Sequence, residues 1–252
     1  LYLVVILLNI VYLNRFLSKD LLHGLMINEI FFILLPVIIY LVFFRINILH
    51  LFDHLFSFKH IVFSVIVGVS IFFVLNRISS FVEGFFDLPV EYIENKYQLL
   101  DELRRSGIVK AIIVVAAIPA LCEELLFRGV ILKGLLASFG SSISILTVSV
   151  LFALFHFDLY LLMNNLIAGI FLTIIAQRAG LLYAMIVHFI NNILVYIIFI
   201  KPQWLPFIKI TVDDAGYIND IAIPNYIIWG SVIVLSLSVV SLIRIRNVDV
   251  EQ

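Results

Sequence analysis

Charged residues are scarce in this 252-residue chain, at 13%, whereas an ordinary soluble domain has about 25%. Hydrophobic residues reach 63%, and the mean hydropathy is +1.18. The formal net charge of −1 provides no basic surface, so no nucleic-acid partner is expected. Lipid is therefore the expected solvent for most of the chain, as in an integral membrane protein.

Three further features are missing from the sequence. The single cysteine, Cys122, excludes an internal disulfide. The HExxH helix of common zinc proteases is absent. The first apolar run, residues 1–10, has no basic flank and no small-residue cleavage site, and the chain begins at Leu1 rather than Met. We therefore expect a truncated first helix rather than a signal peptide.

Long apolar segments are abundant, and they determine the expected fold class. A helix that spans a bilayer needs about 20 mostly apolar residues. The sequence predicts an all-α, polytopic membrane protein with about eight transmembrane helices and a buried polar site. The expected spans are residues 1–14, 26–44, 60–76, 108–134, 141–157, 160–177, 181–200 and 225–243.

The polar segments divide the chain into three parts of one structural domain. Residues 1–107 hold the N-terminal transmembrane helices and, at 88–106, a charged stretch with apolar residues at spacings of three and four. This stretch predicts an amphipathic helix at the membrane surface or against the bundle, either a plain connector or part of a substrate access route. Residues 108–200 are the expected catalytic core. Residues 201–252 hold a polar loop, compatible with a small hairpin, and the last transmembrane helix.

Two adjacent carboxylates and an arginine lie within the apolar segment 108–134, where ionisable groups are expensive and usually mark function. Glu124 and Arg128 are four positions apart, so they share a helix face and can form an ion pair. Glu123 points about 100° away around the helix. Since Arg128 neutralises Glu124, Glu123 is left to act as a base.

Later spans add two histidines and an asparagine. His156 ends one span, and His188 and Asn192 share a face of another. Each of these residues alone is more often a packing residue than a catalytic one, but their coincidence with Glu123 favours a site. Glu123 and His156 could activate a water that attacks a carbonyl, with His188 and Asn192 stabilising the oxyanion. Alternatively, Glu123, His156 and His188 could be ligands of one divalent metal such as zinc.

At these residues the sequence resembles the CAAX protease and bacteriocin-processing family of intramembrane proteases (the CPBP or Abi family), which includes the type II CAAX prenyl endopeptidases. Its motifs EExxxR, FxxxH and HxxxN correspond to residues 123–128, 152–156 and 188–192. The resemblance covers about residues 108–196. It implies an eight-helix membrane fold with a cavity open to one side.

The resemblance also implies roles for the motif residues. Glu123 and His156 would activate water, and His188 and Asn192 would support the oxyanion, while Glu124 and Arg128 would shape the site. We therefore expect an intramembrane endopeptidase in a prokaryotic plasma membrane, with membrane lipid and a membrane-associated peptide or protein as partners. A prenylated substrate is not implied, and the choice between one divalent metal and no cofactor stays open, as does the oligomeric state.

Two functions from other classes remain as alternatives. Glutamate, histidine and arginine relays also occur in proton- or ion-coupled transporters. Transporters often show internal repeats and broken helices in corresponding halves, and neither is clear in this sequence. The third possibility is a non-catalytic membrane scaffold of the same family, against which the presence of every motif residue argues.

Overall fold

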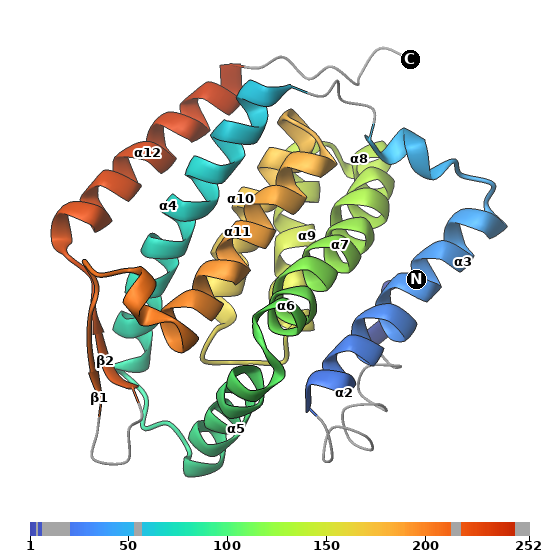
Figure 1. Cartoon of the computed structure of the whole chain (residues 1–252). Helices are drawn as coiled ribbons and strands as arrows, with labels where there is room; N and C mark the ends of the chain where they lie inside the picture. The colour runs from blue at the N-terminus through green and yellow to red at the C-terminus, as the bar shows by residue number, and fades with distance from the viewer. Residues whose placement is uncertain (4, 7–20, 53–56, 213–217, 245–252) are drawn as a thin grey trace.

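The computed structural model describes residues 1–3, 5–6, 21–52, 57–212 and 218–244 (Figure 1). Helices dominate this part of the chain, as the composition predicts. The labelled elements are α2 (Leu21–Ile27), α3 (Leu35–Phe43), α4 (Phe58–Glu83), α5 (Val90–Ser106), α6 (Ile108–Ile112), α7 (Ile118–Glu124), α8 (Leu132–Phe139), α9 (Ser141–Phe155), α10 (Leu162–Arg178), α11 (Leu181–Ile200), β1 (Lys209–Val212), β2 (Ile218–Ala222) and α12 (Asn225–Arg244). Short 3₁₀ helices cover Ile48–Phe52 and Pro202–Trp204.

Four of the described helices are long and apolar enough to cross a membrane, judged by length and composition: Leu21–Phe43, Phe58–Glu83, Leu181–Ile200 and Asn225–Leu242. The expected count of about eight is not confirmed. Helices α9 and α10 are apolar but shorter than a full span. The segment expected at 108–134 is helical but carries several charged residues, and most of the expected span 1–14 lies outside the described residues.

Two of the long helices contain π-helical segments whose cause can be read from the sequence. The segments are Asn28–Leu34, between α2 and α3, and Ile113–Ala117, between α6 and α7. Pro36 and Pro119 each follow two residues after such a segment. Proline has no N–H, and its ring clashes with the carbonyl four residues earlier, which in both cases lies inside the π segment. A third π segment, Leu125–Ile131, contains no proline.

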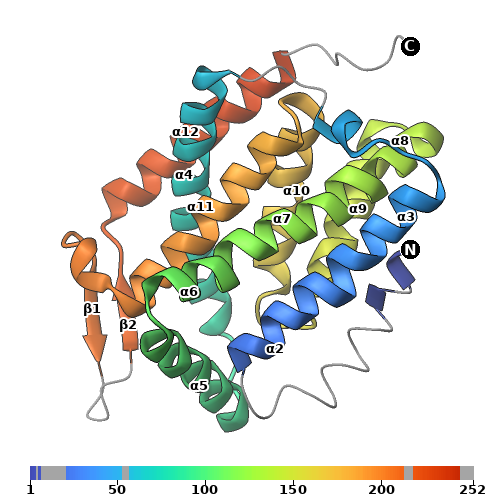
Figure 2. The same cartoon turned by 45° about the vertical axis from the view of Figure 1, so that its right-hand side comes forward.

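The helices pack as a bundle with α9, α10 and α11 between two outer groups (Figures 1 and 2). Helices α4 and α12 lie side by side on one flank, and the α2–α3 helix runs along the α6–α8 helix on the other. Small residues allow close approach inside the bundle. A Cβ at Gly68 would lie 2.8 Å from Ile190 Cβ on α11, and one at Gly169 would lie 3.1 Å from Ser149 Cα on α9.

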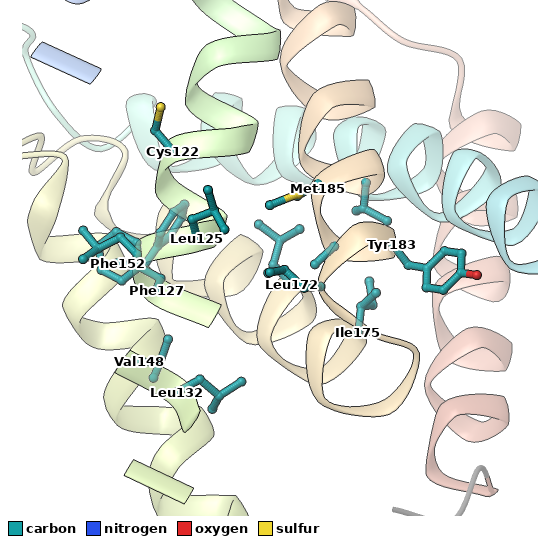
Figure 3. Packing of buried hydrophobic residues seen from close by; sticks show 14 of the residues in the cluster. Cys122, Leu125, Phe127, Leu132, Val148, Phe152, Leu172, Ile175, Tyr183 and Met185 are labelled. Atoms are coloured by element: carbon teal, nitrogen blue, oxygen red, sulfur yellow. The ribbon is translucent and has the colours of Figure 1, made fainter. Parts of the chain in front are cut away.

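The largest core cluster of the described residues joins α7 and the π segment Leu125–Ile131 to α9, α10 and α11 (Figure 3). Phe127 packs edge-to-face against Phe152, with ring centroids 5.2 Å apart. Leu172 and Ile175 of α10 continue this core toward Met185 of α11 (Figure 3). The core thus fixes the helices that carry the three motifs relative to one another.

Two peripheral elements agree with the sequence. The amphipathic segment forms α5, whose Leu100 and Leu103 pack against Leu22 of α2 and Tyr196 of α11. The Glu102 carboxylate accepts the N–H of Leu22 (3.1 Å), so α5 also caps the start of α2. The polar loop contains an antiparallel hairpin of β1 and β2.

Candidate active site

A buried ion pair lies at the centre of the bundle. The Arg128 guanidinium donates to Glu124 Oε1 (2.8 Å), to the Gly169 carbonyl (3.2 Å) and to Thr173 Oγ1 (3.3 Å). Both charged side chains are fully buried. The ion pair expected from the four-residue spacing is therefore present, and α10 supplies the remaining acceptors for the guanidinium. Thr173 was not singled out in the sequence, because a lone threonine in an apolar helix carries no catalytic signal.

The two histidines face Glu123 through the same ring nitrogen. His156 Nε2 and His188 Nε2 each lie 3.9 Å from Glu123 Oε2. His156 Nδ1 lies 2.9 Å from the Phe152 carbonyl, and His188 Nδ1 lies 2.9 Å from Glu124 Oε1. Carbonyl and carboxylate oxygens only accept, so both Nδ1 atoms carry the proton. In a neutral ring, Nε2 is then an acceptor directed toward Glu123.

His156 sits at the end of α9, where the chain leaves the helix. The next residue, Phe157, has φ +50°, and this left-handed conformation ends α9. The His156 side chain is 30% exposed, against 7% for His188 and 8% for Glu123. His156 is therefore the most exposed of these three groups.

A polar cavity of about 80 Å³ joins these groups. It lies between α4, α7, α9, α10 and α11, and Glu123, His156, His188 and Asn192 line it. A cavity holds a water molecule once about 10–15 Å³ of such volume is available, provided that polar partners are present. The site therefore has room for several waters beside Glu123.

The two asparagines of the third motif region are hydrogen-bonded to each other. Asn191 Nδ2 donates to Asn192 Oδ1 (3.3 Å), and both residues line the cavity. Because its oxygen is occupied, Asn192 is oriented to use its NH₂ group as a donor. Sequence reasoning missed this contribution of Asn191, which lies on a different helix face from His188 and Asn192 in an ideal helix.

The metal interpretation finds no ligand set in the described part of the chain. No group of three or more His, Cys, Asp or Glu side chains there is arranged to hold a metal ion. The Glu123, His156 and His188 set considered from the sequence is therefore not assigned as a metal centre, and no chemical step below depends on one.

Comparison with known protein families gives a match over the segment that carries the three motifs. The family model described as "Type II CAAX prenyl endopeptidase Rce1-like" matches residues 105–194, from the end of α5 into α11. This match supports the resemblance drawn from the three motifs. No curated protein and no solved structure matches the chain.

The family match and the apolar helices together indicate the class of protein. The Rce1-like segment indicates a protease-type enzyme, and the four apolar helices indicate an integral membrane protein. All six predicted site residues lie inside the Rce1-like segment, and the structure brings them together around the cavity or its ion pair. Their catalytic roles stay predictions.

One buried carboxyl near the site comes from outside the Rce1-like segment. Glu29, in the π segment of the α2–α3 helix, is 8% exposed, and this segment packs against α7, which carries Glu123. Sequence reasoning missed Glu29. Its signal was available, because a lone carboxylate in an apolar span is expensive, but nothing in the sequence placed its helix beside the one that carries Glu123.

Helix α5 is tied to the loop that follows His156. The Tyr92 hydroxyl donates to Asp158 Oδ2 (3.0 Å), while Asp158 Oδ1 accepts the N–H groups of Tyr160 and Leu161 (2.9 and 3.0 Å). The Tyr92 and Tyr160 rings also pack, with centroids 4.7 Å apart. Helix α5 thus helps to fix the loop beside the exposed edge of the site.

We expect Tyr92 to make stability depend on alkaline pH. Burial, followed by the negative charge of Asp158, raises the pKa of Tyr92 above its ordinary value of about 10. The stabilisation is therefore complete below about pH 10 and is lost as pH rises toward the folded-state pKa. Melting temperatures measured between about pH 8 and 12 should fall less steeply in Tyr92→Phe than in the wild type. Tyr226→Phe, at an exposed position, is the control; parallel curves for wild type and Tyr92→Phe would contradict the prediction.

Proposed function

We propose that this protein is an intramembrane endopeptidase that hydrolyses a peptide bond of a membrane-associated protein or peptide. The observation that carries the proposal is the convergence of Glu123 Oε2 with the Nε2 atoms of His156 and His188 beside a polar cavity. The Rce1-like match supports the reaction class. A prokaryotic plasma membrane is the setting that we propose for it.

Glu123 and His156 are the proposed activators of water. A water between them donates one hydrogen bond to Glu123 and one to the unprotonated Nε2 of His156. As its oxygen attacks the scissile carbonyl carbon, a proton moves to this pair, which then returns it to the leaving amine when the C–N bond breaks. The products are a carboxylate and an amine, and the balance requires no metal or other cofactor.

His188 and Asn192 are the proposed stabilisers of the oxyanion. Asn192 donates through its NH₂ group, which the contact with Asn191 leaves available. His188 can donate from Nε2 only in its imidazolium form, because its Nδ1–H is already directed at Glu124. Glu124 and Arg128 therefore act indirectly in this mechanism, by fixing the ring of His188.

The shape of the site suggests how a substrate reaches it. A cavity of about 80 Å³ holds water but not a peptide, so the chain to be cleaved must bind across the exposed side at His156. The family description names prenyl endopeptidases. For this protein we propose only a membrane-associated substrate. The test below determines whether that substrate has to be prenylated.

The test is proteolysis by purified protein in liposomes against a peptide library with prenylated and unprenylated members. We expect new peptide termini from the wild type, at rates that a chelator leaves unchanged. Loss of cleavage on chelation, restored by zinc, would overturn the cofactor-free mechanism. Absence of cleavage across the library, together with ion flux through the liposomes, would overturn the peptidase in favour of a transporter.

A further inference from the structure

One polar side chain that lines the cavity belongs to none of the three motifs. Asn165 lies in the first turn of α10, and Asn165, Ala168 and Leu172 of this helix all line the cavity. These positions are three and four residues apart, so their side chains share one face of the helix. The amide of Asn165 therefore borders the same space as Glu123 and His156.

The packing of α10 on α9 places Asn165 toward the exposed edge of the site. The two helices run in opposite directions (Figure 1), and they come closest where Gly169 meets Ser149. Asn165 lies about one turn before Gly169, so it lies about one turn beyond Ser149, in the direction of His156. This is the side on which the proposed substrate binds.

The side-chain nitrogen of Asn165 has an unused donor. Its Nδ2 atom is buried, and no acceptor among the described residues takes its N–H groups. The other polar side chains of the cavity wall contact one another, since Glu123 faces both histidines and Asn191 donates to Asn192. Buried donors are nearly always paired, because an unpaired one is costly. An unused donor on the wall of a polar cavity thus indicates that its acceptor binds in the cavity.

The reacting carbonyl needs donors, and the site has few of them. Both histidines direct their Nδ1 protons at oxygens of the protein, so their Nε2 atoms are acceptors in the neutral rings. The Glu123 carboxylate also only accepts. An oxyanion is stabilised by N–H or O–H donors placed around it. Asn191 already uses its amide on Asn192, which leaves the NH₂ groups of Asn192 and Asn165 facing the cavity.

We propose that Asn165 is a further catalytic residue, whose NH₂ group donates, together with that of Asn192, to the oxyanion that forms on the scissile carbonyl. This inference rests on the proposed peptidase function. The hydrogen stays on the amide nitrogen throughout the reaction, so this donor acts whichever form the His188 ring has.

Asn165→Leu tests the role because it removes the donor and nearly conserves the volume. We expect kcat to fall by about 10²-fold with KM unchanged, as on removal of one oxyanion donor. Initial rates in liposomes, with a peptide that the wild type cleaves, measure this effect. A phosphinate analogue of that peptide, with tetrahedral phosphorus in place of the scissile carbonyl carbon, should lose affinity by a similar factor, because it resembles the oxyanion.

The neighbouring asparagine of α10 is the matched control. Asn164 Nδ2 donates to the Leu75 carbonyl of α4 (3.1 Å), and Asn164 does not line the cavity. Asn164→Leu should therefore keep wild-type kcat and KM but lower the melting temperature by about 2–4 °C, through loss of one hydrogen bond. Asn165→Leu should show the reverse, with a melting temperature that is unchanged or higher, because no bond within the protein is lost.

Separate outcomes would overturn the inference and the proposed function. Wild-type kcat in Asn165→Leu, while the wild type cleaves peptide, would overturn the inference alone. Equal loss of affinity for the peptide and for its phosphinate analogue would also overturn it, because Asn165 would then bind the substrate rather than the oxyanion. A melting temperature as low as that of Asn164→Leu would show that the Asn165 amide is already paired within the protein. Absence of cleavage by the wild type would overturn the peptidase function itself.

Discussion

Glu123→Gln is expected to lower kcat for peptide cleavage by about 10²- to 10⁴-fold, the usual contribution of a general base. Glutamine has nearly the same shape, so the packing of α7 and the cavity should persist, but its carboxamide cannot take a proton from water. The oxygen that is lost as a base is the one 3.9 Å from both histidine Nε2 atoms. Initial rates in liposomes over a range of substrate concentrations measure the effect.

The controls for Glu123→Gln separate chemistry from binding and folding. KM should change little, because Glu123 is buried and acts on water rather than on the bound chain. Glu91→Gln repeats the substitution at an exposed site and should retain full turnover. Unchanged kcat in Glu123→Gln would contradict its assignment as the base, whatever the substrate.

Arg128→Ala is expected to reduce the free energy of unfolding by about 3–5 kcal/mol, because it leaves a buried charge without its partner. Glu124 has no exposed side-chain surface, and among the described residues its Oε1 would keep only the hydrogen bond from His188 once Arg128 is removed. The Gly169 carbonyl and Thr173 also lose a donor. Reversible denaturation in mixed micelles, followed by tryptophan fluorescence, measures the loss.

An exposed ion pair in the same protein provides the matched control. Arg104 pairs with Asp101 at 3.5 Å, and both side chains are more than 40% exposed. Arg104→Ala should therefore change the free energy of unfolding by less than about 1 kcal/mol. Equal effects of Arg104→Ala and Arg128→Ala would show that Glu124 is solvated in the folded protein. Arg128→Lys should recover only part of the loss, since an ammonium group cannot reproduce the fork of three contacts.

The sequence predicted the motif residues because helical spacing already relates them. Glu124 and Arg128 are four apart, and so are Phe152 and His156. A four-residue spacing places two side chains on one face whatever the tertiary structure. The ion pair of the first motif and the Phe152–His156 contact are both present, the latter with ring centroids 4.8 Å apart.

Contacts between distant elements were beyond the reach of spacing arguments. Buried Glu29 comes near the site only because the α2–α3 helix packs along α7, and Tyr92 meets Asp158 only because α5 folds against the loop after α9. The expected count of about eight spans is also not confirmed, since four of the described helices meet the length and composition of a span. The apolar segment 141–157 predicted a transmembrane span. In the structure α9 has 15 residues, because Gly140 precedes it and the left-handed turn at Phe157 ends it.

The central claim is that Glu123 activates water for peptide hydrolysis, and the most direct test follows the oxygen of that water. Wild-type protein and Glu123→Gln in liposomes would be incubated with substrate in water labelled with a heavy oxygen isotope. The masses of the products would then be measured by mass spectrometry. The account predicts new C-terminal carboxylates carrying the label from the wild type and none above background from Glu123→Gln. Equal labelled cleavage by both proteins would contradict it.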